Sequence, residues 1–274
     1  MIFKAFIREP LRHVYSLLKH KDYRLWCFES TRLSGLPRFE RCRGKVRDWV
    51  LDVPDAASFL AAYKEIFVTE IYRFDADSNA PKILDLGANI GLSVLYFKAL
   101  YPNAQITAFE ADPAIYECLK NNVYRNGFTD VELINKAVWD SNGKIRFRVE
   151  GGDGGRVVQD DDKHGMEIET IDISALIAGK SYDLLKMDIE GAEHKVLPAI
   201  KNYLHNFRFV FIEYHSEPDQ PQTLGFMLNM LSSAGFRFDI QNIMTRRHPF
   251  ISNRAINEFD LQLNIFAWNG RCEP

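Results

Sequence analysis

A short glycine-containing loop follows an apolar run near the middle of the chain. Residues 83–93 read ILDLGANIGLS, so Asp85 ends the run and Gly87 and Gly91 stand four residues apart. Glycines at such positions let a chain turn sharply off a strand and approach a ligand closely. A dinucleotide loop also needs a middle glycine for its pyrophosphate, but Asn89 stands near that place, and the Asp85 carboxylate would repel a diphosphate. The pattern favours a cationic ligand without phosphate, and S-adenosylmethionine is such a ligand.

Two later segments could complete a nucleoside site. Glu110, in AFEAD, follows the loop by about 20 residues, where an acid commonly binds ribose hydroxyls. This position suits both NAD and S-adenosylmethionine and does not choose between them. The backbone at Ala137 and Val138, or the ring of Trp139, could border an adenine, although Trp139 is equally well explained as a core aromatic residue.

A second group of polar residues could perform proton transfer. Lys186 and Asp188 end the apolar run in YDLLKMD, and Glu213 and His215 end the next run in FIEYH. Residues two apart on a strand point to the same side. A hydroxyl acceptor must lose its proton as its oxygen attacks a methyl group, and a histidine or a desolvated carboxylate can take that proton. We therefore predict Asp188, His215, Glu213 and Lys186 as catalytic residues.

The same residues leave other interpretations open. Asp188, Glu213 and His215 could hold a divalent cation that lowers the pKa of the acceptor, so a metal is possible although none is predicted. Glu190 and Glu193 stand where a helix is expected to begin, and acids there are also favoured by the helix dipole.

These residues require a frame that brings strand ends together. From residue 82 onward, short apolar runs alternate with amphipathic segments, which predicts strands and crossover helices in a mostly parallel sheet. Ligands bind beyond the carboxyl ends of the strands in such a sheet. The last two runs are joined without a clear helix and are expected to pair antiparallel. The expected strands, about seven, are KILDLG, QITAFE, VELIN, DLLKMD, RFVFIEYH, RFDIQ and LQLNIFAW.

Two further regions flank or interrupt this pattern. Residues 1–80 are expected to form a mostly helical extension, with a break at 34–37, and residues 81–274 the cofactor-binding domain. The Gly-rich segment GGDGGRVVQDDDKHG breaks the strand pattern after the third run. It is either a surface loop or a lid over the acceptor, with Arg156 as a contact to a sugar or an anion.

Composition limits the class of protein. The 274 residues carry a formal net charge of −3, which gives no overall footprint for nucleic acid. Four scattered cysteines exclude a CxxC zinc site, and the charged N-terminus lacks the apolar stretch of a signal peptide or span, which favours a cytoplasmic location.

The basic residues before position 48 are a solvated face or a patch for an anionic substrate or membrane surface. Peripheral membrane contact is left open by Ile2, Phe3, Phe6 and Ile7.

In order along the chain, these pieces resemble the FkbM family of S-adenosylmethionine-dependent methyltransferases. The resemblance rests on ILDLGANIGLS, AFEADP, NKAVWD, LLKMDIEGAE and IEYH, and covers roughly residues 50–240. It implies an α/β, Rossmann-like class I methyltransferase fold, with a seven-stranded, mostly parallel sheet and an antiparallel last strand. It also implies transfer of a methyl group to oxygen, usually a hydroxyl of a sugar, a glycan or a natural product.

The resemblance also assigns roles to individual residues. The loop residues would surround the methionine part of the cofactor, Glu110 would bind its ribose, Asp112 and Ala137 would lie near the adenine, and Asp188 would face the methyl-transfer centre. The predicted cofactor-binding residues are Asp85, Gly87, Ala88, Asn89, Gly91, Glu110, Ala111, Asp112, Ala137 and Asp188. A nicotinamide-dependent oxidoreductase and a non-catalytic cofactor-binding module remain as alternatives.

Overall fold

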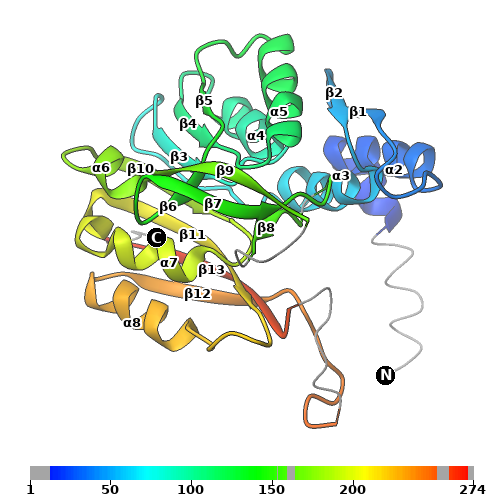
Figure 1. The fold of residues 1–274 in the computed structure, drawn as a ribbon. Helices are drawn as coiled ribbons and strands as arrows, with labels where there is room; N and C mark the ends of the chain where they lie inside the picture. The colour runs from blue at the N-terminus through cyan, green and yellow to red at the C-terminus, as the bar shows by residue number, and fades with distance from the viewer. Residues whose placement is uncertain (1–12, 153, 159–163, 252–258, 271–274) are drawn as a thin grey trace, which may run out of the picture.

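A seven-stranded sheet forms the centre of the molecule (Figure 1). The computed structural model describes residues 13–152, 154–158, 164–251 and 259–270. In spatial order the strands are β12 (Arg237–Asn242), β13 (Leu261–Trp268), β11 (Phe207–Ser216), β10 (Tyr182–Met187), β3 (Lys82–Leu86), β4 (Gln105–Phe109) and β5 (Glu132–Ile134). Strand β13 runs antiparallel to both of its neighbours, and the other neighbouring pairs are parallel. The predicted sheet and its reversed final strand are therefore confirmed.

Helices cover both faces of the sheet, which is why its strands read as nearly continuous apolar runs. On β3, Ile83 faces one core and Leu84 and Leu86 face the other, as expected for alternating side chains. The first core is closed by α3 (Ala56–Tyr63), the π-helical turn η1 (Lys64–Val68), α4 (Leu92–Leu100) and α5 (Pro113–Arg125). The second is closed by α6 (Ile173–Ile177), α7 (Glu193–Ala199), η2 (Lys201–Asn206) and α8 (Leu224–Ser233).

The strand order reverses between β3 and β10. The chain passes from β3 outward to β4 and β5 and then returns to add β10 and β11 on the other side. Such a switch point opens a crevice at the carboxyl edge of the sheet, where ligands bind in this architecture. The register places Lys186 between Asp85 and Phe211, and Glu213 opposite Asn264.

A second, four-stranded sheet follows β5 and was not predicted. Its order is β6 (Ala137–Trp139), β9 (Gly165–Asp172), β7 (Gly143–Arg148) and β8 (Arg156–Val157). Its two longer strands contain the sequences KIRFR and MEIETID, whose alternation of polar and apolar residues is typical of half-buried strands, and the Gly-rich segment lies between them. Most of the Gly-rich segment joins β7 to β9 through β8, and its residues 153 and 159–163 lie outside the described residues.

The N-terminal extension is less helical than predicted. After α2 (Lys21–Leu33), strands β1 (Cys42–Val46) and β2 (Trp49–Val53) form an antiparallel hairpin. Arg47 in the two-residue turn has a φ of 53°, as such hairpin turns require. The hairpin buries Val46 and Leu51 in the same core as α4 and α5, so sheet packing overrides the helical pattern expected there.

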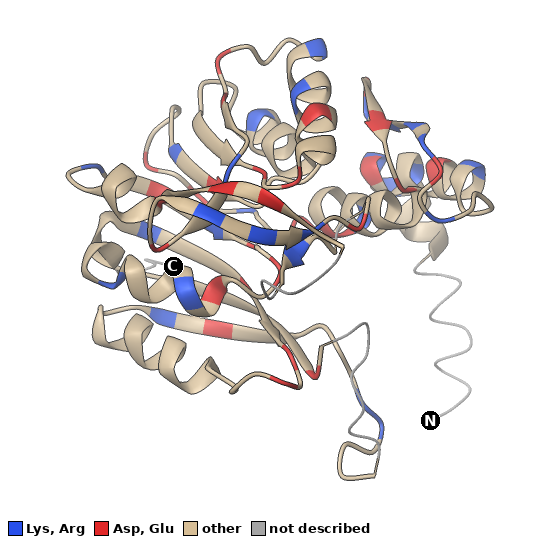
Figure 2. Ribbon diagram, in the orientation of Figure 1, with Lys and Arg blue, Asp and Glu red and all other residues tan. Residues whose placement is uncertain are grey.

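Several charges on the extension are paired. Arg47 lies 2.8 Å from Asp22, and Arg43 and Arg125 each lie 2.8 Å from Asp52. Figure 2 shows blue and red bands interspersed over this part of the chain. This favours the interpretation of a solvated, internally paired face over a patch for an anion.

The apolar residues considered for membrane contact precede position 13 and lie outside the described residues. Among the described residues, no helix has the length and apolarity needed to span a bilayer.

Candidate active site

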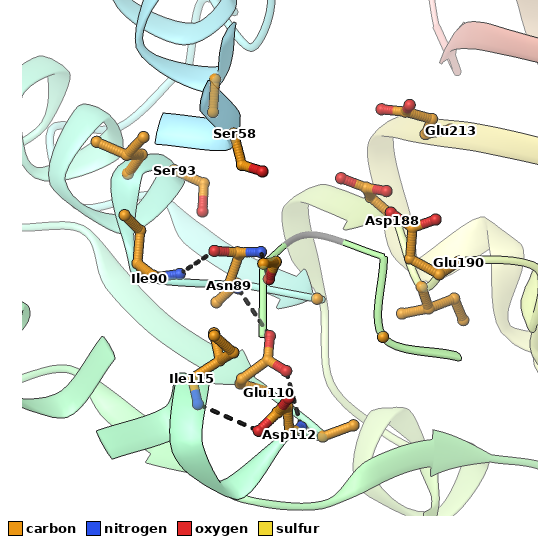
Figure 3. A pocket seen from close by; sticks show the side chains of 18 of the residues that line it. Ser58, Asn89, Ile90, Ser93, Glu110, Asp112, Ile115, Asp188, Glu190 and Glu213 are labelled. Atoms are coloured by element: carbon orange, nitrogen blue, oxygen red, sulfur yellow. Dashed lines mark hydrogen bonds between the residues drawn. The ribbon is translucent and has the colours of Figure 1, made fainter. Parts of the chain in front are cut away.

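A cavity of about 310 Å³ opens at the carboxyl edge of the main sheet. Figure 3 shows Asn89, Glu110 and Asp112 on one side of it and Asp188, Glu190 and Glu213 grouped on the other. Of the predicted cofactor-binding residues, the cavity is lined by Gly87, Ala88, Asn89, Glu110, Ala111, Asp112, Ala137 and Asp188. Asp85 and Gly91 do not line it, and their contacts explain why.

The loop after β3 is built around two glycines with different tasks. Gly87 has a φ of 89°, and a Cβ at this position would lie 1.8 Å from the carbonyl oxygen of Asp188. Only glycine permits this approach between the ends of β3 and β10. Gly91, with a φ of 94°, packs the start of α4 against Leu119, where a Cβ would come within 2.9 Å of Cδ1. Gly87 therefore lines the cavity, and Gly91 fixes the loop by packing against α5 on the side away from the cavity.

Glu110 connects this loop to the end of β4. The backbone N–H groups of Asn89 and Asp112 donate to its two carboxylate oxygens, each at 2.9 Å. Burial outweighs these donors and raises the pKa of Glu110 to about 7. Each oxygen keeps a second lone pair, so the side chain can still accept hydrogen bonds from a ribose.

The side of the cavity near Ala137 has an apolar wall that the sequence did not reveal. Ala137 from β6 clusters with Phe147, while Ala111 and Val157 pack against them. Phe147 and Val157 come from the unpredicted small sheet and line the cavity. Asp112 is occupied as the N-cap of α5, accepting from the backbone of Ala114 at 2.8 Å. Its side chain therefore orients the helix.

Lys186 forms the floor between the two halves of the site. Its ammonium donates to the Gly87 carbonyl at 2.5 Å and lies 3.4 Å from both Asp85 Oδ1 and Asp188 Oδ2. Burial alone would lower the pKa of Lys186, but Asp85 and Asp188 outweigh it and raise that pKa. Asp85 is fully buried and also accepts from Ser93 Oγ at 2.6 Å. Asp85 thus positions Lys186 and the loop without facing the cavity.

His215 lies behind the cavity rather than on its surface. It is 5% exposed, and Nδ1 lies 3.2 Å from Glu193 Oε1. Its Nε2 lies 3.5 Å from Glu213 Oε1 and 3.6 Å from Glu190 Oε2. Burial lowers the pKa of His215, but the carboxylates, Glu193 first, outweigh it and raise that pKa well above its usual range. The predicted proximity of Glu213, His215 and Asp188 holds, since ligand atoms of all three lie within 4.8 Å of one another.

Sequence reasoning missed residues that reach this end of the cavity from distant segments. Glu65 on η1 lines the cavity, and burial together with Glu213 and Asp188 raises its pKa to about 7. Gln262 on β13 also lines it and donates to Glu213 Oε1 at 2.5 Å. No local motif marks either residue, because β13 and η1 meet here only through the fold.

The Gly-rich segment touches both the loop and the extension. Asn89 Nδ2 donates to the Gly152 carbonyl at 3.4 Å. A Cβ on Gly152 would lie 3.3 Å from Ser58 Oγ and 3.4 Å from the Phe39 ring. Gly152 and Gly155 line the cavity, whereas Arg156 does not. The segment lines the site with these two glycines, and the structure does not bring the predicted contact residue Arg156 to the cavity.

The fold and the cavity define a class of protein. A mostly parallel sheet with a reversed last strand, a glycine loop after β3 and an acid at the end of β4 define a Rossmann-like fold of the class I methyltransferase type. Residues 85–238 match the profile of the methyltransferase FkbM domain, and the chain belongs to this family.

Curated relatives agree with this assignment. The chain is 32% identical over 159 residues to 2-O-methyltransferase NoeI of Sinorhizobium fredii, covering 50% of this chain and 64% of that protein. It is 26% identical to 31-O-demethyl-FK506 methyltransferase FkbM of Streptomyces tacrolimicus, covering 74% of this chain and 88% of the relative. It is also 26% identical to hexuronic acid methyltransferase AglP of Haloferax volcanii, covering 64% and 70%. The chain therefore spans less than two thirds of the length of NoeI.

Proposed function

We propose that this chain is an S-adenosylmethionine-dependent O-methyltransferase that acts on a hydroxyl of a sugar, a glycan or a natural product. The observation that carries the proposal is one continuous cavity lined by the Gly87–Asn89 loop and Glu110 at one end and by Asp188 and Glu213 at the other. The proposed nucleoside site and a group of proton acceptors thus share one cavity.

The charges around the loop support S-adenosylmethionine over a dinucleotide. The buried Lys186 is held by Asp85 and Asp188, so its charge is compensated before any ligand enters. A diphosphate would face the Asp188 carboxylate, which lines the cavity, whereas the sulfonium and ammonium groups of S-adenosylmethionine are attracted by it. This argues against the nicotinamide-dependent oxidoreductase.

For the reaction, we assign proton acceptance to Asp188 or Glu213. The acceptor oxygen attacks the methyl carbon, the carbon–sulfur bond breaks, its electron pair stays on sulfur, and the hydroxyl proton passes to a carboxylate. Both carboxylates line the cavity, while His215 does not. His215 is therefore a positioning residue that orients Glu213, and this replaces its predicted role as a base in direct contact with substrate.

The named relatives support the class of acceptor. Their names specify a 2-O position, a 31-O-demethyl compound and a hexuronic acid. The first two names state methylation at an oxygen, and the third names a sugar acid as the acceptor. The cavity residues Asp188, Glu213 and Gln262 offer the carboxylate and amide groups that bind such hydroxyls.

Two measurements test the proposal. Calorimetric titration with S-adenosylmethionine and with NADH should show binding of the first only. A methyl-transfer assay with labelled cofactor against sugars, glycan fragments and lipids should then yield labelled product. Tight NADH binding without a response to S-adenosylmethionine would overturn the assignment. Cofactor binding without transfer to any acceptor would favour the non-catalytic binding module.

A further inference from the structure

The far end of the cavity combines side chains of the types that bind divalent cations. Asp188 from the end of β10 and Glu213 and His215 from the end of β11 place their ligand atoms within 4.8 Å of one another. Two ligands of one ion at about 2.1 Å lie at most about 4.2 Å apart, so small side-chain rotations would bring all three to bonding distance.

The contact between His215 Nδ1 and a carboxylate resembles the one found at metal-binding imidazoles. A ligating histidine almost always gives its other ring N–H to a carboxylate or carbonyl group, which fixes the tautomer and the ring orientation. Here His215 Nδ1 faces Glu193 Oε1 at 3.2 Å. Glu193 is itself fully buried and held by the backbone N–H groups of Ile189 at 3.1 Å and Gly191 at 3.1 Å. The imidazole is therefore oriented with Nε2 toward the other two residues.

Polar atoms of several acidic and amide side chains surround Nε2. Glu213 Oε1 and Glu190 Oε2 lie 3.5 and 3.6 Å from it, and the Gln262 amide nitrogen lies 3.2 Å from it. Beside Glu213 in the register of β11 and β13, Asn264 is 3% exposed, and its Oδ1 has no hydrogen-bond partner among the described residues. Paired residues of an antiparallel sheet share one face, so Asn264 Oδ1 lies on the same face as Glu213 and His215. Buried oxygens left unpaired beside carboxylates are costly unless a donor or a cation reaches them.

We propose that Asp188, Glu213 and His215 bind one divalent cation, with Glu193 as the residue that orients the imidazole. Two carboxylates and one imidazole suit Mn²⁺ or Mg²⁺ better than a structural zinc site, which uses mainly thiolates and imidazoles. The ion takes the place now held by the Gln262 amide between Glu213 and Nε2. Its open positions face the cavity, where a hydroxyl can coordinate and pass its proton more readily to the carboxylate oxygen of Asp188 or Glu213 that does not bind the ion. This role in acceptor activation rests on the proposed methyl transfer, whereas the binding of the ion does not.

Direct binding of Mn²⁺ tests the site independently of activity. The full-length chain is treated with EDTA, dialysed and titrated with Mn²⁺, and free ion is measured by its paramagnetic resonance signal. We expect one bound ion per chain, with Mg²⁺ as a competitor. Asp188→Asn and Glu213→Gln keep side-chain size and should each weaken Mn²⁺ binding at least tenfold. Glu193→Gln should weaken it about tenfold, as is usual for the outer partner of a ligating histidine.

A matched control and a second ligand make each outcome decisive. Glu132→Gln alters an exposed carboxylate on β5 that bonds Thr107, and it should bind Mn²⁺ within twofold of the wild type. Thermal unfolding checks that each variant is folded. Absence of saturable Mn²⁺ binding, or equal binding by the wild type, Asp188→Asn and Glu213→Gln, would overturn the inference. Titration of the same samples with S-adenosylmethionine separates the two ideas: cofactor binding without Mn²⁺ binding rejects only the metal site, and the reverse rejects only the proposed function.

Discussion

Gly87 shows how a single residue joins two strand ends into a site. Its left-handed backbone and the 1.8 Å distance from a hypothetical Cβ to the Asp188 carbonyl oxygen leave no room for a side chain. The carbonyl group of Gly87 itself accepts a hydrogen bond from the Lys186 ammonium. This ammonium also lies close to the carboxylates of Asp85 and Asp188. One missing methyl group thus permits the contact on which the charged floor of the cavity depends.

Gly87→Ala should be strongly destabilising. We expect a loss of about 3 kcal/mol or more, because a backbone clash adds to the cost of a positive φ. Gly127→Ala is the matched control, since Gly127 has a φ of 91° and nothing within 4 Å of its Cβ position. It should cost only about 1 kcal/mol. Urea unfolding measures both, and equal losses would show that the contact with Asp188 is unimportant.

Glu110 predicts a specific pH dependence of stability. Its pKa rises from 4.5 to about 7 on folding, so between these values the folded chain holds a proton that the unfolded chain has lost. Its contribution to stability therefore falls as pH rises through this window, by at most about 3 kcal/mol. Glu110→Gln cannot ionise and should remove this fall. Unfolding free energies of both proteins at pH 5, 6, 7 and 8 give the comparison, and parallel profiles would contradict it.

At the scale of elements, the N-terminus of α3 ties the extension to the cavity. Asp55 caps α3 by accepting from Ser58 N–H at 2.9 Å and Ser58 Oγ at 2.7 Å. It also accepts from Phe39 N–H at 2.9 Å and from Arg38 Nε at 3.0 Å. Ser58 and Phe39 are the residues against which Gly152 packs. One buried carboxylate thus supports the surface on which the Gly-rich segment rests.

Asp55→Ala should therefore affect both stability and cofactor binding. Loss of the cap and of the other hydrogen bonds should cost about 2 kcal/mol, and the cofactor should bind several-fold more weakly. Asp172→Ala is the control, because Asp172 caps α6 through Ser174 N–H at 2.9 Å and does not line the cavity. It should lose stability and keep cofactor affinity. Unfolding and calorimetry measure the two effects, and unchanged affinity in Asp55→Ala would separate the extension from the site.

At the scale of the whole molecule, the extension and the main sheet share one core. Phe59 of α3 and Leu51 of β2 belong to the same buried cluster as Leu95 of α4 and Leu119 of α5. The proposed boundary at residues 80 and 81 marks where the strand–helix alternation begins. We infer that it does not mark an independently folding unit.

Truncation tests this inference. A chain of residues 81–274 would expose the apolar surfaces of α4 and α5 and lack Glu65 and Ser58 from the cavity wall. We expect it to lose cooperative thermal unfolding and measurable cofactor binding. A truncated chain with the melting temperature and cofactor affinity of the full chain would instead support residues 1–80 as a separate domain.

Local patterns were sufficient for the main sheet and for the cofactor loop. Apolar runs of strand length, separated by amphipathic segments, identify β3 to β5 and β10 to β13. The signal is clearest for β3, β10 and β11, which are mostly buried, whereas the edge strand β12 is largely exposed. They were insufficient for the small sheet and the hairpin β1–β2. The strands of both are half-exposed, and the glycines around residue 152 separate the two longer strands of the small sheet, β7 and β9.

The sequence by itself determined the glycine loop, the acid of β4 and the polar ends of β10 and β11, because each depends on residues close together in the chain. Only the tertiary structure decided which of these side chains face the cavity. It places Asp85 and His215 behind the surface and brings Glu65, Phe147 and Gln262 onto it. The reason is that strand register and helix packing set where a side chain points, and both depend on contacts between segments that are distant in the sequence.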